Sequence, residues 1–483
     1  TIVGLPDKAV EESRDRVSAA IKNSGFTSPK SKNQKVVISL APADLKKEGP
    51  SFDLAIALSY LLAAEEISFD PEGKTFLGEL SLEGTIRPVR GILPSVLEAK
   101  QRGFTEVFVP KENAEEAAIV SGIKVLGADT LGEILDHVDT KRDKQVPLPQ
   151  QKETCIVHTT KTHDVTLDDI RGQQTAKRGL EISAAGGHNI ALFGPPGTGK
   201  TMLARALAHL LPELSLEEVL EVTAIHSVSG ILNEPLVTKP PFRAPHHTAS
   251  YVALTGGGTF PKPGEITLAH RGVLFLDEFP EFERRVIEAL RQPLEERVVN
   301  ISRAKGSQTF PAHFILIAAM NPCPCGNYGT GRECTCSSGT LMRYQRKMSG
   351  PIIDRIDMWI EVSNIPYEQL SKKSVSTEET ETTRKRVLAA RTIQMERFKN
   401  AERSIATNSS MSVRDLDTFI DLDSNVKDIL NVSAKKLDLS PRAYHRVVKL
   451  ARTIADLDNK NNIEVPHILE ALQYRPKKLI TTI

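Results

Sequence analysis

A glycine-rich loop between an apolar run and a helical pattern constrains the fold of this chain more than any other feature. The apolar run covers residues 189–193, and the helical pattern covers residues 201–211. Glycines let the backbone N–H groups of such a loop close around phosphates, and the following helix points its positive N-terminal end at them. This strand–loop–helix order predicts an α/β fold that binds a nucleoside triphosphate. The loop residues are Gly194, Pro195, Pro196, Gly197, Thr198, Gly199, Lys200 and Thr201.

Lys200 and Thr201 are the first residues expected to act on the nucleotide. Lys200 should reach the β- and γ-phosphates of ATP, and Thr201 should ligate Mg²⁺. A second apolar strand, residues 272–276, ends at Asp277 and Glu278. Acids at the carboxyl end of a strand in an open α/β sheet face the ligand, so we expect Asp277 to hold Mg²⁺ and Glu278 to activate the attacking water. The alternative is that both acids only begin the helix that follows them.

Three further polar residues suit the chemistry of phosphoryl transfer. Asn321 follows the apolar run of residues 313–320, where its side chain can contact the γ-phosphate or the attacking water. The alternative for Asn321 is the start of an Asn-Pro turn. Arg355 and Arg442 stay charged and can bind phosphate oxygens in a fork, so both suit a transition-state role. A surface ion pair is the alternative for each arginine.

Changes in composition divide the chain into four parts. Residues 1–138 mix strand-like and helical patterns, and residues 139–163 are polar, with two prolines and no apolar periodicity. We interpret the second segment as a linker. Residues 164–366 have the α/β pattern of the nucleotide-binding core, and residues 367–483 are helical and charged. The fold class is therefore α/β, with a helical lid at the C-terminal end.

The sequence argues against a membrane-spanning protein and against a secreted one. Charged residues make up 25% of the chain and hydrophobic residues 40%, as in a soluble globular protein, and no apolar run reaches the ~18 residues of a transmembrane helix. No signal peptide is recognisable, so we expect a cytoplasmic protein. The net charge is +1, so any nucleic-acid site must come from local clustering of basic residues.

Four of the five cysteines lie close together in the sequence. Cys323 and Cys325 form one Cys-x-Cys pair, and Cys334 and Cys336 form another. Four thiolates at such spacing can close a tetrahedral site, so the pattern predicts bound Zn²⁺. The alternative is four free thiols on a loop. A zinc site here would brace the segment between Asn321 and Arg355.

The motifs together resemble the magnesium-chelatase-like branch of the AAA+ ATPases. The whole chain, with its leading domain and its cysteine cluster, most resembles the bacterial ComM/YifB proteins. That family has further residues before the segment matched by Thr1, so we expect this chain to lack its first residues. The segments that carry the resemblance are Asp-Ile-Arg-Gly-Gln at 169–173, Ala-Ala-Gly-Gly-His-Asn at 184–189, Phe-Arg-Ala-Pro-His-His at 242–247 and Ser-Gly-Pro-Ile-Ile-Asp-Arg at 349–355.

The resemblance implies roles for individual residues and an assembly. Ile170 and Gly172 would contact the nucleotide, and Asn321 would be sensor 1. Arg355 would be the arginine finger that acts in the neighbouring subunit of a homo-hexameric ring, and Arg442 would be sensor 2. ComM-type proteins act as helicases that promote branch migration of recombination intermediates in natural transformation, so single-stranded or branched DNA is the expected partner.

A hairpin pattern precedes sensor 1. Residues 297–310 alternate as strand, turn and strand, with Arg303 and Lys305 near the tip. In related AAA+ motors such a hairpin enters the pore of the ring, so these two side chains would meet DNA phosphates. The alternative is a solvated hairpin tip. By the same resemblance, residues 243–262 are an insertion in the second helix of the core and form a second pore loop.

The first domain resembles the proteolytic domain of Lon. Gly49, Pro50 and Ser51 match the segment that carries the nucleophile in that family, but Leu93 stands at the position of the catalytic lysine. A leucine cannot accept the proton of a serine hydroxyl, so we interpret the domain as a scaffold. We expect Ser51 to cap the following helix.

Two other functions remain open at this point. One is a motor subunit of the magnesium chelatase type that assists metal insertion, and the other is an ATP-dependent protease. The Lon-like domain and the cysteine cluster argue against the first alternative, and Leu93 argues against the second. We expect stimulation of ATP hydrolysis by DNA to separate a DNA helicase from both.

Overall fold

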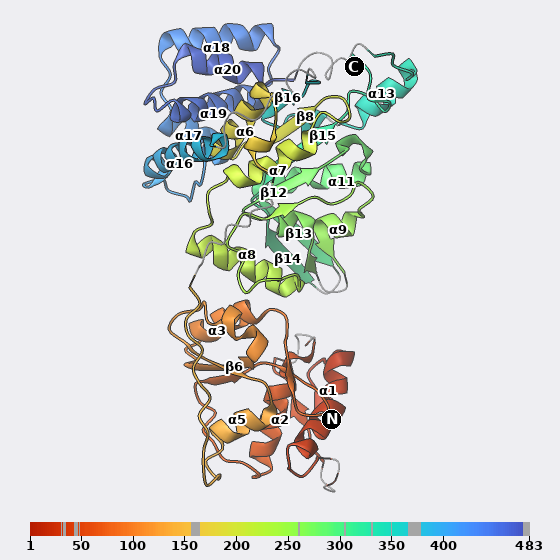
Figure 1. Cartoon of the computed structure of the whole chain (residues 1–483), viewed down its shortest axis with the longest axis vertical. Helices are drawn as coiled ribbons and strands as arrows, with labels where there is room; N and C mark the ends of the chain where they lie inside the picture. The colour runs from red at the N-terminus through yellow and green to blue at the C-terminus, as the bar shows by residue number, and fades with distance from the viewer. Residues whose placement is uncertain are drawn as a thin grey trace. The chain divides into compact units, whose positions relative to one another are not determined.

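The structure is a computed structural model, and it describes residues 1–476 except 30, 32–34, 43–46, 48, 156–164, 259–260, 304–305, 330–331, 349 and 366–377. The chain divides into two compact units, whose elements are labelled in Figure 1. Unit 1 contains Thr1–His158 and Leu216–Thr238, and unit 2 contains Thr159–Ser215 and Lys239–Ile483. No helix of the described residues is long and apolar enough to cross a membrane.

Unit 1 is an α/β unit around a parallel sheet in the order β3-β6-β7. Successive side chains of β6 point to opposite faces, so Phe108 packs in one hydrophobic core while Val107 and Val109 pack in another. The elements are β1 (Ile2–Val3), α1 (Lys8–Asn23), β2 (Ile38–Ser39), η1 (Pro50–Phe52), α2 (Asp53–Ala63), β3 (Lys74–Phe76), β4 (Glu79–Leu80), β5 (Ile86–Arg87), α3 (Ile92–Gln101), β6 (Glu106–Pro110), η2 (Lys111–Asn113), α4 (Ala114–Ala117), β7 (Lys124–Ala128), α5 (Leu131–Val138) and α8 (Leu216–Ser229).

Helix α8 belongs to unit 1 although its sequence lies beyond the glycine-rich loop. Its Leu220 and Ala224 pack on the core that contains α3. The buried Ser227 hydroxyl donates to the Glu116 carboxylate and accepts from the backbone N–H of Gly91 at 3.0 Å. No periodicity or composition of the sequence indicates that residues 216–238 complete the first unit.

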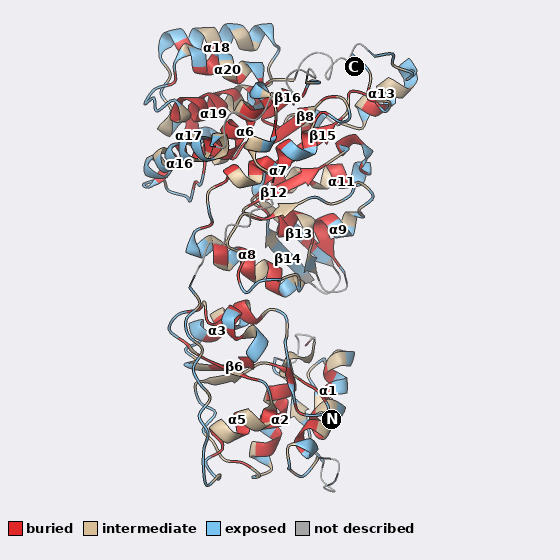
Figure 2. Cartoon of the chain, in the orientation of Figure 1, coloured by how far each residue is buried: buried red, intermediate tan, exposed pale blue. Residues whose placement is uncertain are grey.

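Unit 2 contains a five-stranded sheet in the order β16-β8-β15-β12-β9, in which all pairings are parallel. Its strands are β8 (Ile190–Phe193), β9 (Phe242–Arg243), β12 (Val273–Leu276), β15 (Ile315–Met320) and β16 (Met358–Glu361). The inner strands are apolar on both faces and buried, as Figure 2 shows in red, because helices cover both sides.

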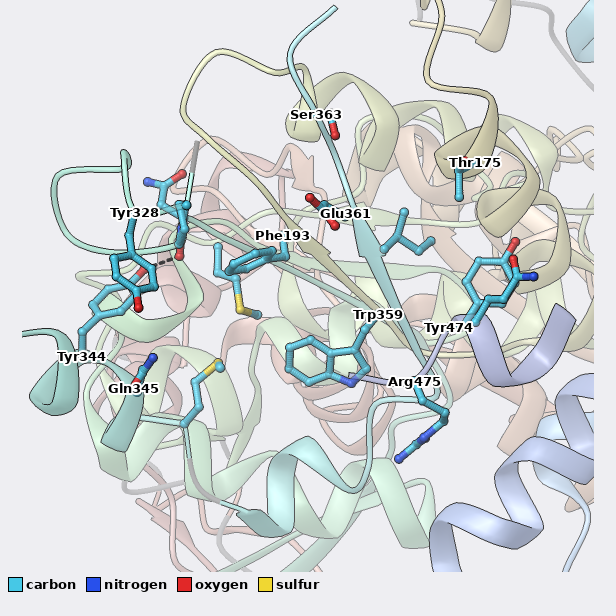
Figure 3. Close-up of a pocket in the computed structure, with 17 residues that line it drawn as sticks. Thr175, Phe193, Tyr328, Tyr344, Gln345, Trp359, Glu361, Ser363, Tyr474 and Arg475 are labelled. Atoms are coloured by element: carbon cyan, nitrogen blue, oxygen red, sulfur yellow. Dashed lines mark hydrogen bonds between the residues drawn. The ribbon is translucent and has the colours of Figure 1, made fainter. Parts of the chain in front are cut away.

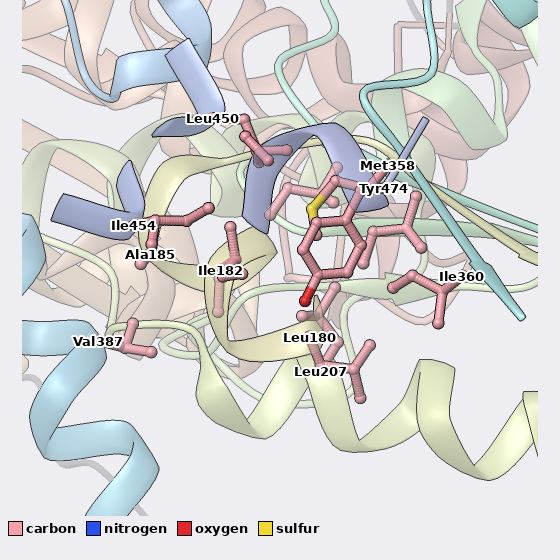
Figure 4. Close-up of a cluster of buried hydrophobic side chains, with 14 of the residues drawn as sticks. Leu180, Ile182, Ala185, Leu207, Met358, Ile360, Val387, Leu450, Ile454 and Tyr474 are labelled. Atoms are coloured by element: carbon pink, nitrogen blue, oxygen red, sulfur yellow. The ribbon is translucent and has the colours of Figure 1, made fainter. Parts of the chain in front are cut away.

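Helices of the two faces of this sheet contribute to two separate cores. On one face α6 (Gln174–Gly186) and α7 (Lys200–Leu210) lie between the sheet and the C-terminal helices. Figure 4 shows this core, which contains Leu180 and Ile182 of α6 together with Ile454. The C-terminal helices are α16 (Glu379–Phe398), α17 (Val413–Phe419), α18 (Ser424–Lys436), α19 (Pro441–Leu457) and α20 (Val465–Gln473), with η5 (Asn408–Ser410) among them.

The opposite face carries shorter elements and a hairpin. The antiparallel hairpin consists of β13 (Val298–Arg303) and β14 (Gly306–Pro311), as the sequence predicted. The remaining elements of unit 2 are η3 (Leu167–Asp169), α9 (Tyr251–Thr255), β10 (Gly256–Gly257), β11 (Lys262–Pro263), α10 (Glu265–Leu268), η4 (Phe279–Glu281), α11 (Arg284–Ala289), α12 (Arg291–Glu296), α13 (Ser338–Arg346) and α14 (Gly350–Ile353).

The observed fold confirms the α/β class with a helical C-terminal region, and it corrects two local predictions. The helix expected directly after Glu278 is a short 3₁₀ turn followed by α11, because Phe282 leaves the helical conformation at ψ 148°. Ser51 does not cap α2. It lies inside the 3₁₀ turn η1, and α2 begins after Phe52 without a side-chain cap.

The buried Asp357 joins the sheet of unit 2 to α19. Its Oδ2 accepts the backbone N–H of Asn189 at 2.9 Å, and its Oδ1 accepts from the guanidinium of Arg446. Burial would raise the pKa of Asp357, but Arg446 and the other donors hold it well below its ordinary value. The carboxylate therefore stays charged inside the protein, where its loss would leave a cation unpaired.

We expect Asp357→Ala to lower the free energy of unfolding of unit 2 by about 3–5 kcal/mol, because Arg446 and the N–H of Asn189 would lose their acceptor. Trp359 is the single tryptophan of the chain, so its fluorescence during urea denaturation reports on this unit. Asp354→Ala is the matched control and should cost less than ~1 kcal/mol, since no cation lies within 4.0 Å of that carboxylate among the described residues. Equal losses in the two variants would contradict the prediction.

Candidate functional site

The glycine-rich loop lies between β8 and α7, at the carboxyl end of the sheet. The Lys200 ammonium donates to the carbonyl oxygens of Gly194 at 2.8 Å and Pro195 at 2.7 Å. It also donates to Oδ1 of Asn321 at 3.1 Å. Burial lowers the pKa of Lys200, and the nearby Asp277 carboxylate acts in the opposite direction. The structure thus brings two of the predicted site residues, Lys200 and Asn321, into direct contact.

Asp277 and Glu278 follow β12, next to the same loop. The Thr201 hydroxyl donates to Oδ2 of Asp277 at 3.1 Å, so the two expected Mg²⁺ ligands are neighbours. Hard oxygen donors of this kind suit Mg²⁺. Glu278 has a left-handed backbone with φ 50°, and its carboxylate is half-exposed.

His247 is a partner of Glu278 to which the sequence assigned no role. Its Nδ1 lies 2.8 Å from Oε2 of Glu278. The rings of His246 and His247 also lie close together, with centroids 4.2 Å apart and planes tilted by 33°. The Ala-Pro-His-His segment stood out only as part of a family pattern, and spacing alone could not show that it returns to Glu278.

Arg355 and Arg442 lie together, away from the glycine-rich loop. Arg355 precedes β16 and donates to one carboxylate oxygen of Glu295, while Nη2 of Arg442 donates to the other oxygen at 3.0 Å. Partial burial would raise the pKa of Glu295, but Arg355 and Arg442 bring it below its ordinary value. Glu295 was not singled out in the sequence, because a Glu-Glu pair at a helix end has many surface roles.

The remaining predicted residues have simpler positions. Ile170 is buried in the main core of unit 2, and Gly172 turns the chain with φ 58° just before α6. Arg303 ends the backbone of β13 at the tip of the hairpin, where it pairs with Gly306 in the register. The side chain of Arg303 and all of Lys305 lie outside the described residues.

The four clustered cysteines converge in space. Their Sγ atoms all lie within 4.8 Å of one another. The Sγ atom of Cys323 is 3.3 Å from that of Cys325 and 3.8 Å from that of Cys334. A tetrahedral site with Zn–S bonds of about 2.3 Å requires sulfur–sulfur distances of about 3.8 Å, so the donor set fits a zinc ion. Cys155 is exposed and lies outside the cluster.

The cysteine loop packs directly on the glycine-rich loop. A Cβ atom added to Gly326 would lie 2.5 Å from Cδ of Pro196. On its other side, the loop borders a cavity of about 590 Å³ behind Asn321, where Tyr344 donates to the backbone carbonyl of Asn321 at 3.1 Å. Figure 3 shows Tyr328, Tyr344 and Trp359 around this cavity. The position of Asn321 thus depends on the cysteine loop and on α13.

These elements define a P-loop protein of the AAA+ class. Three models of the magnesium chelatase family match the chain in order. "Subunit ChlI of Mg-chelatase" matches residues 1–113, "Magnesium chelatase, subunit ChlI" matches 166–370, and the C-terminal model of the same subunit matches 377–475.

Curated relatives cover nearly the whole chain. Competence protein ComM of Haemophilus influenzae is 44% identical over 477 residues, which are 98% of this chain and 91% of the relative. The uncharacterized protein YifB of Escherichia coli is 44% identical over 480 residues, with the same coverage of both chains. The chain therefore belongs to the ComM/YifB family of magnesium-chelatase-like AAA+ proteins. A shorter match, 37% identical over 94 residues, is found with DNA repair protein RadA of Streptococcus pyogenes and covers 20% of each chain.

We expect Gly326→Ala to weaken nucleotide binding at least tenfold, a change of about 1.4 kcal/mol, because the added methyl group would push Pro196 out of the phosphate-binding loop. Gly329→Ala is the matched control. Gly329 also has a positive φ, 73° against 81° for Gly326, but its two chain neighbours aside, no atom of the described residues lies within 4 Å of the position that its added methyl group would take. Titration with a fluorescent ATP analogue measures both variants, and equal affinities would show that the contact with Pro196 does not matter.

Proposed function

We propose that this protein is an ATP-driven DNA helicase that works as a hexameric ring and promotes branch migration of recombination intermediates in natural transformation. The similarity to competence protein ComM along 98% of the chain carries the proposal. The shorter similarity to a DNA repair protein supports contact with DNA. The arrangement of Lys200, Asp277 and Glu278 supports ATP hydrolysis as the source of energy.

Each residue of the P-loop site has a proposed task. Lys200 binds the β- and γ-phosphates after leaving the carbonyl oxygens that hold it now. Glu278 takes the proton of the attacking water, and His247 keeps its carboxylate oriented. Thr201 and Asp277 would hold Mg²⁺, and the bound ion would neutralise phosphate charge in the transition state.

The position of Arg355 supports an action on the nucleotide of a neighbouring subunit. Strand β16 runs parallel to β8 with Met358 opposite Ile190, so Arg355 lies at the amino end of the sheet while Gly194 lies at the carboxyl end. Four strand residues separate the two edges by about 13 Å. Arg442 accompanies Arg355 on Glu295, and we assign both arginines to the phosphates of the adjacent protomer.

The hairpin β13–β14 is the proposed DNA contact. In the sequence, Arg303 ends β13 and Lys305 directly precedes β14, and six copies of both in a ring would surround a strand with up to about twelve positive charges. Such phosphate contacts do not depend on base sequence and weaken as salt rises. This grouping would provide the local positive charge that a chain of net charge +1 lacks as a whole.

A chelatase motor is the second candidate, because all three matching family models carry the magnesium chelatase name. A motor of that kind has no reason to respond to DNA. The protease alternative has less support, since Leu93 is fully buried in a hydrophobic core and offers no base.

We expect forked DNA to stimulate ATP hydrolysis by the wild-type protein, and Glu278→Gln to reduce the turnover by about 100-fold or more while ATP still binds. Phosphate release and strand separation are measured with and without DNA. Glu283→Gln is the control, since this exposed carboxylate lies five residues further on and makes no ion pair among the described residues. Turnover that DNA leaves unchanged would favour the chelatase motor, and near wild-type turnover of Glu278→Gln would refute the assigned base.

We also propose that Cys323, Cys325, Cys334 and Cys336 hold one structural Zn²⁺. Elemental analysis of protein purified without chelator should find one zinc per chain, and Cys334→Ser should lose it because only three thiolates remain. Cys155→Ser should keep the metal, since Cys155 is exposed and apart from the cluster. Absence of zinc from the wild-type protein would contradict the proposal.

A further inference from the structure

A second polar cavity lies in unit 2, with a volume of about 700 Å³. It is bordered by the junction of α12 and β13, by the segment around η5, and by α19. Two acidic residues, Glu295 and Glu296, line it together with a larger number of cations. These cations are Arg271, Arg297, Arg403, Arg442, Arg446 and Lys449.

The carboxylates near this cavity do not match all of its cations. Arg446 pairs with Asp357, and Arg403 pairs with Asp415. In contrast, no carboxylate of the described residues lies within 4.0 Å of Arg297. Its Nη1 donates to the backbone carbonyl of Phe314 at 3.2 Å.

Lys449 is a second cation of the cavity whose charge no neighbouring carboxylate of the described residues balances. Within the described part of the chain its ammonium has no carboxylate partner, and it donates to the backbone carbonyl of Ser409 at 3.2 Å. Neutral carbonyl oxygens solvate these cations but leave their charge uncompensated. Since both side chains are half-buried, the protein bears a desolvation cost that a bound anion would offset.

The titration behaviour of groups around the cavity agrees with an excess of positive charge. Burial lowers the pKa of Lys449 to about 8; Asp357 opposes this shift, whereas Arg446, Arg297 and Arg403 add to it. Burial also lowers the pKa of His313 well below its ordinary value, and the nearby Arg297 and Arg271 lower it further.

This cavity is separate from the phosphate-binding loop. Arg271 precedes β12 and His313 precedes β15, so both lie at the amino end of the parallel sheet. The loop of residues 194–201 lies at the carboxyl end. A ligand held by Lys200 in the same protomer therefore cannot occupy the cavity.

We propose that this cavity binds the phosphate chain of a small polyphosphate anion, such as a nucleoside triphosphate, independently of the P-loop of the same chain. Its volume lies in the range of about 300–1,000 Å³ that is typical of small-ligand sites. A nucleic-acid strand would instead need an extended basic groove that follows its backbone. The proposal does not depend on the DNA helicase function, since it concerns only the ligand of the cavity.

The test must distinguish a polyphosphate taken from solution, as proposed, from the nucleotide held by the P-loop of an adjacent protomer, which could reach the cavity only in an assembled ring. Inorganic tripolyphosphate is the probe, and the protein carries Lys200→Ala so that its own P-loop is disabled. Calorimetric titration is made at a protein concentration where sedimentation shows monomers. We expect about one tripolyphosphate per chain under these conditions, because the cavity lies within a single protomer.

Lys449→Gln in this background should weaken the binding at least tenfold, because the amide can still donate to Ser409 but carries no charge. Lys427→Gln is the matched control and should leave the affinity unchanged, since Lys427 is exposed on α18 outside the cavity. The fluorescence of Trp359 verifies that each variant is folded. If Lys449→Gln does not fold, Arg403→Gln, with a more exposed side chain at the cavity, replaces it with the same expectation.

Three results would overturn the proposal. The first is that monomeric Lys200→Ala protein does not bind tripolyphosphate, including the case in which only assembled rings bind it, since the ligand would then belong to the adjacent P-loop. The second is unchanged affinity for tripolyphosphate in Lys449→Gln. The third is that Lys449→Gln weakens binding of a single-stranded oligonucleotide but not of tripolyphosphate, which would make the cavity a DNA contact.

Discussion

The parallel pairing of β8 with β15 and β16 determines where the proposed catalytic residues lie. Because these strands run in one direction, the chain leaves each of them at the same edge, and Gly194 and Asn321 meet there. The Lys200 ammonium bridges the two exits by binding the loop carbonyls and the Asn321 side chain. The same direction places Arg355 at the opposite edge, so one sheet separates the residues proposed to bind nucleotide in the same protomer from the arginine proposed to act on a neighbour.

The cysteine loop connects the proposed zinc site to the glycine-rich loop. It begins two residues after Asn321, returns to pack Gly326 on Pro196, and then leads into α13, whose Tyr344 binds the backbone of Asn321. A metal that holds the four sulfur atoms would therefore restrain sensor 1 as well as the phosphate-binding loop. A zinc ion bound as proposed would thus support the glycine-rich loop through the packing of Gly326 on Pro196.

Helix α8 shows that unit 1 is built from two segments that are separate in the sequence. The segment leaves unit 2 after α7, contributes Leu220, Ala224 and Ser227 to the core and polar contacts of unit 1, and returns before β9. The chain therefore passes between the two units three times: after α5, before α8 and after α8. The connection from α7 to α8 is five residues long, 211–215. The sequence alone could not place α8, because its helical pattern fits either unit.

The sequence by itself determined those elements whose structure depends on residues close together in the chain. The phosphate-binding loop, the acids after β12 and the hairpin β13–β14 could be predicted because glycine spacing, strand exits and turn residues depend on near neighbours. Only the tertiary structure decided which distant groups meet. The contacts of His247 with Glu278, of Glu295 with two arginines, and of Asp357 with Arg446 join segments that are 31 to 147 residues apart, and no periodicity encodes them. Such contacts arise when tertiary packing brings opposite charges from distant segments within reach, and for the buried Asp357 the partner also lowers the desolvation cost.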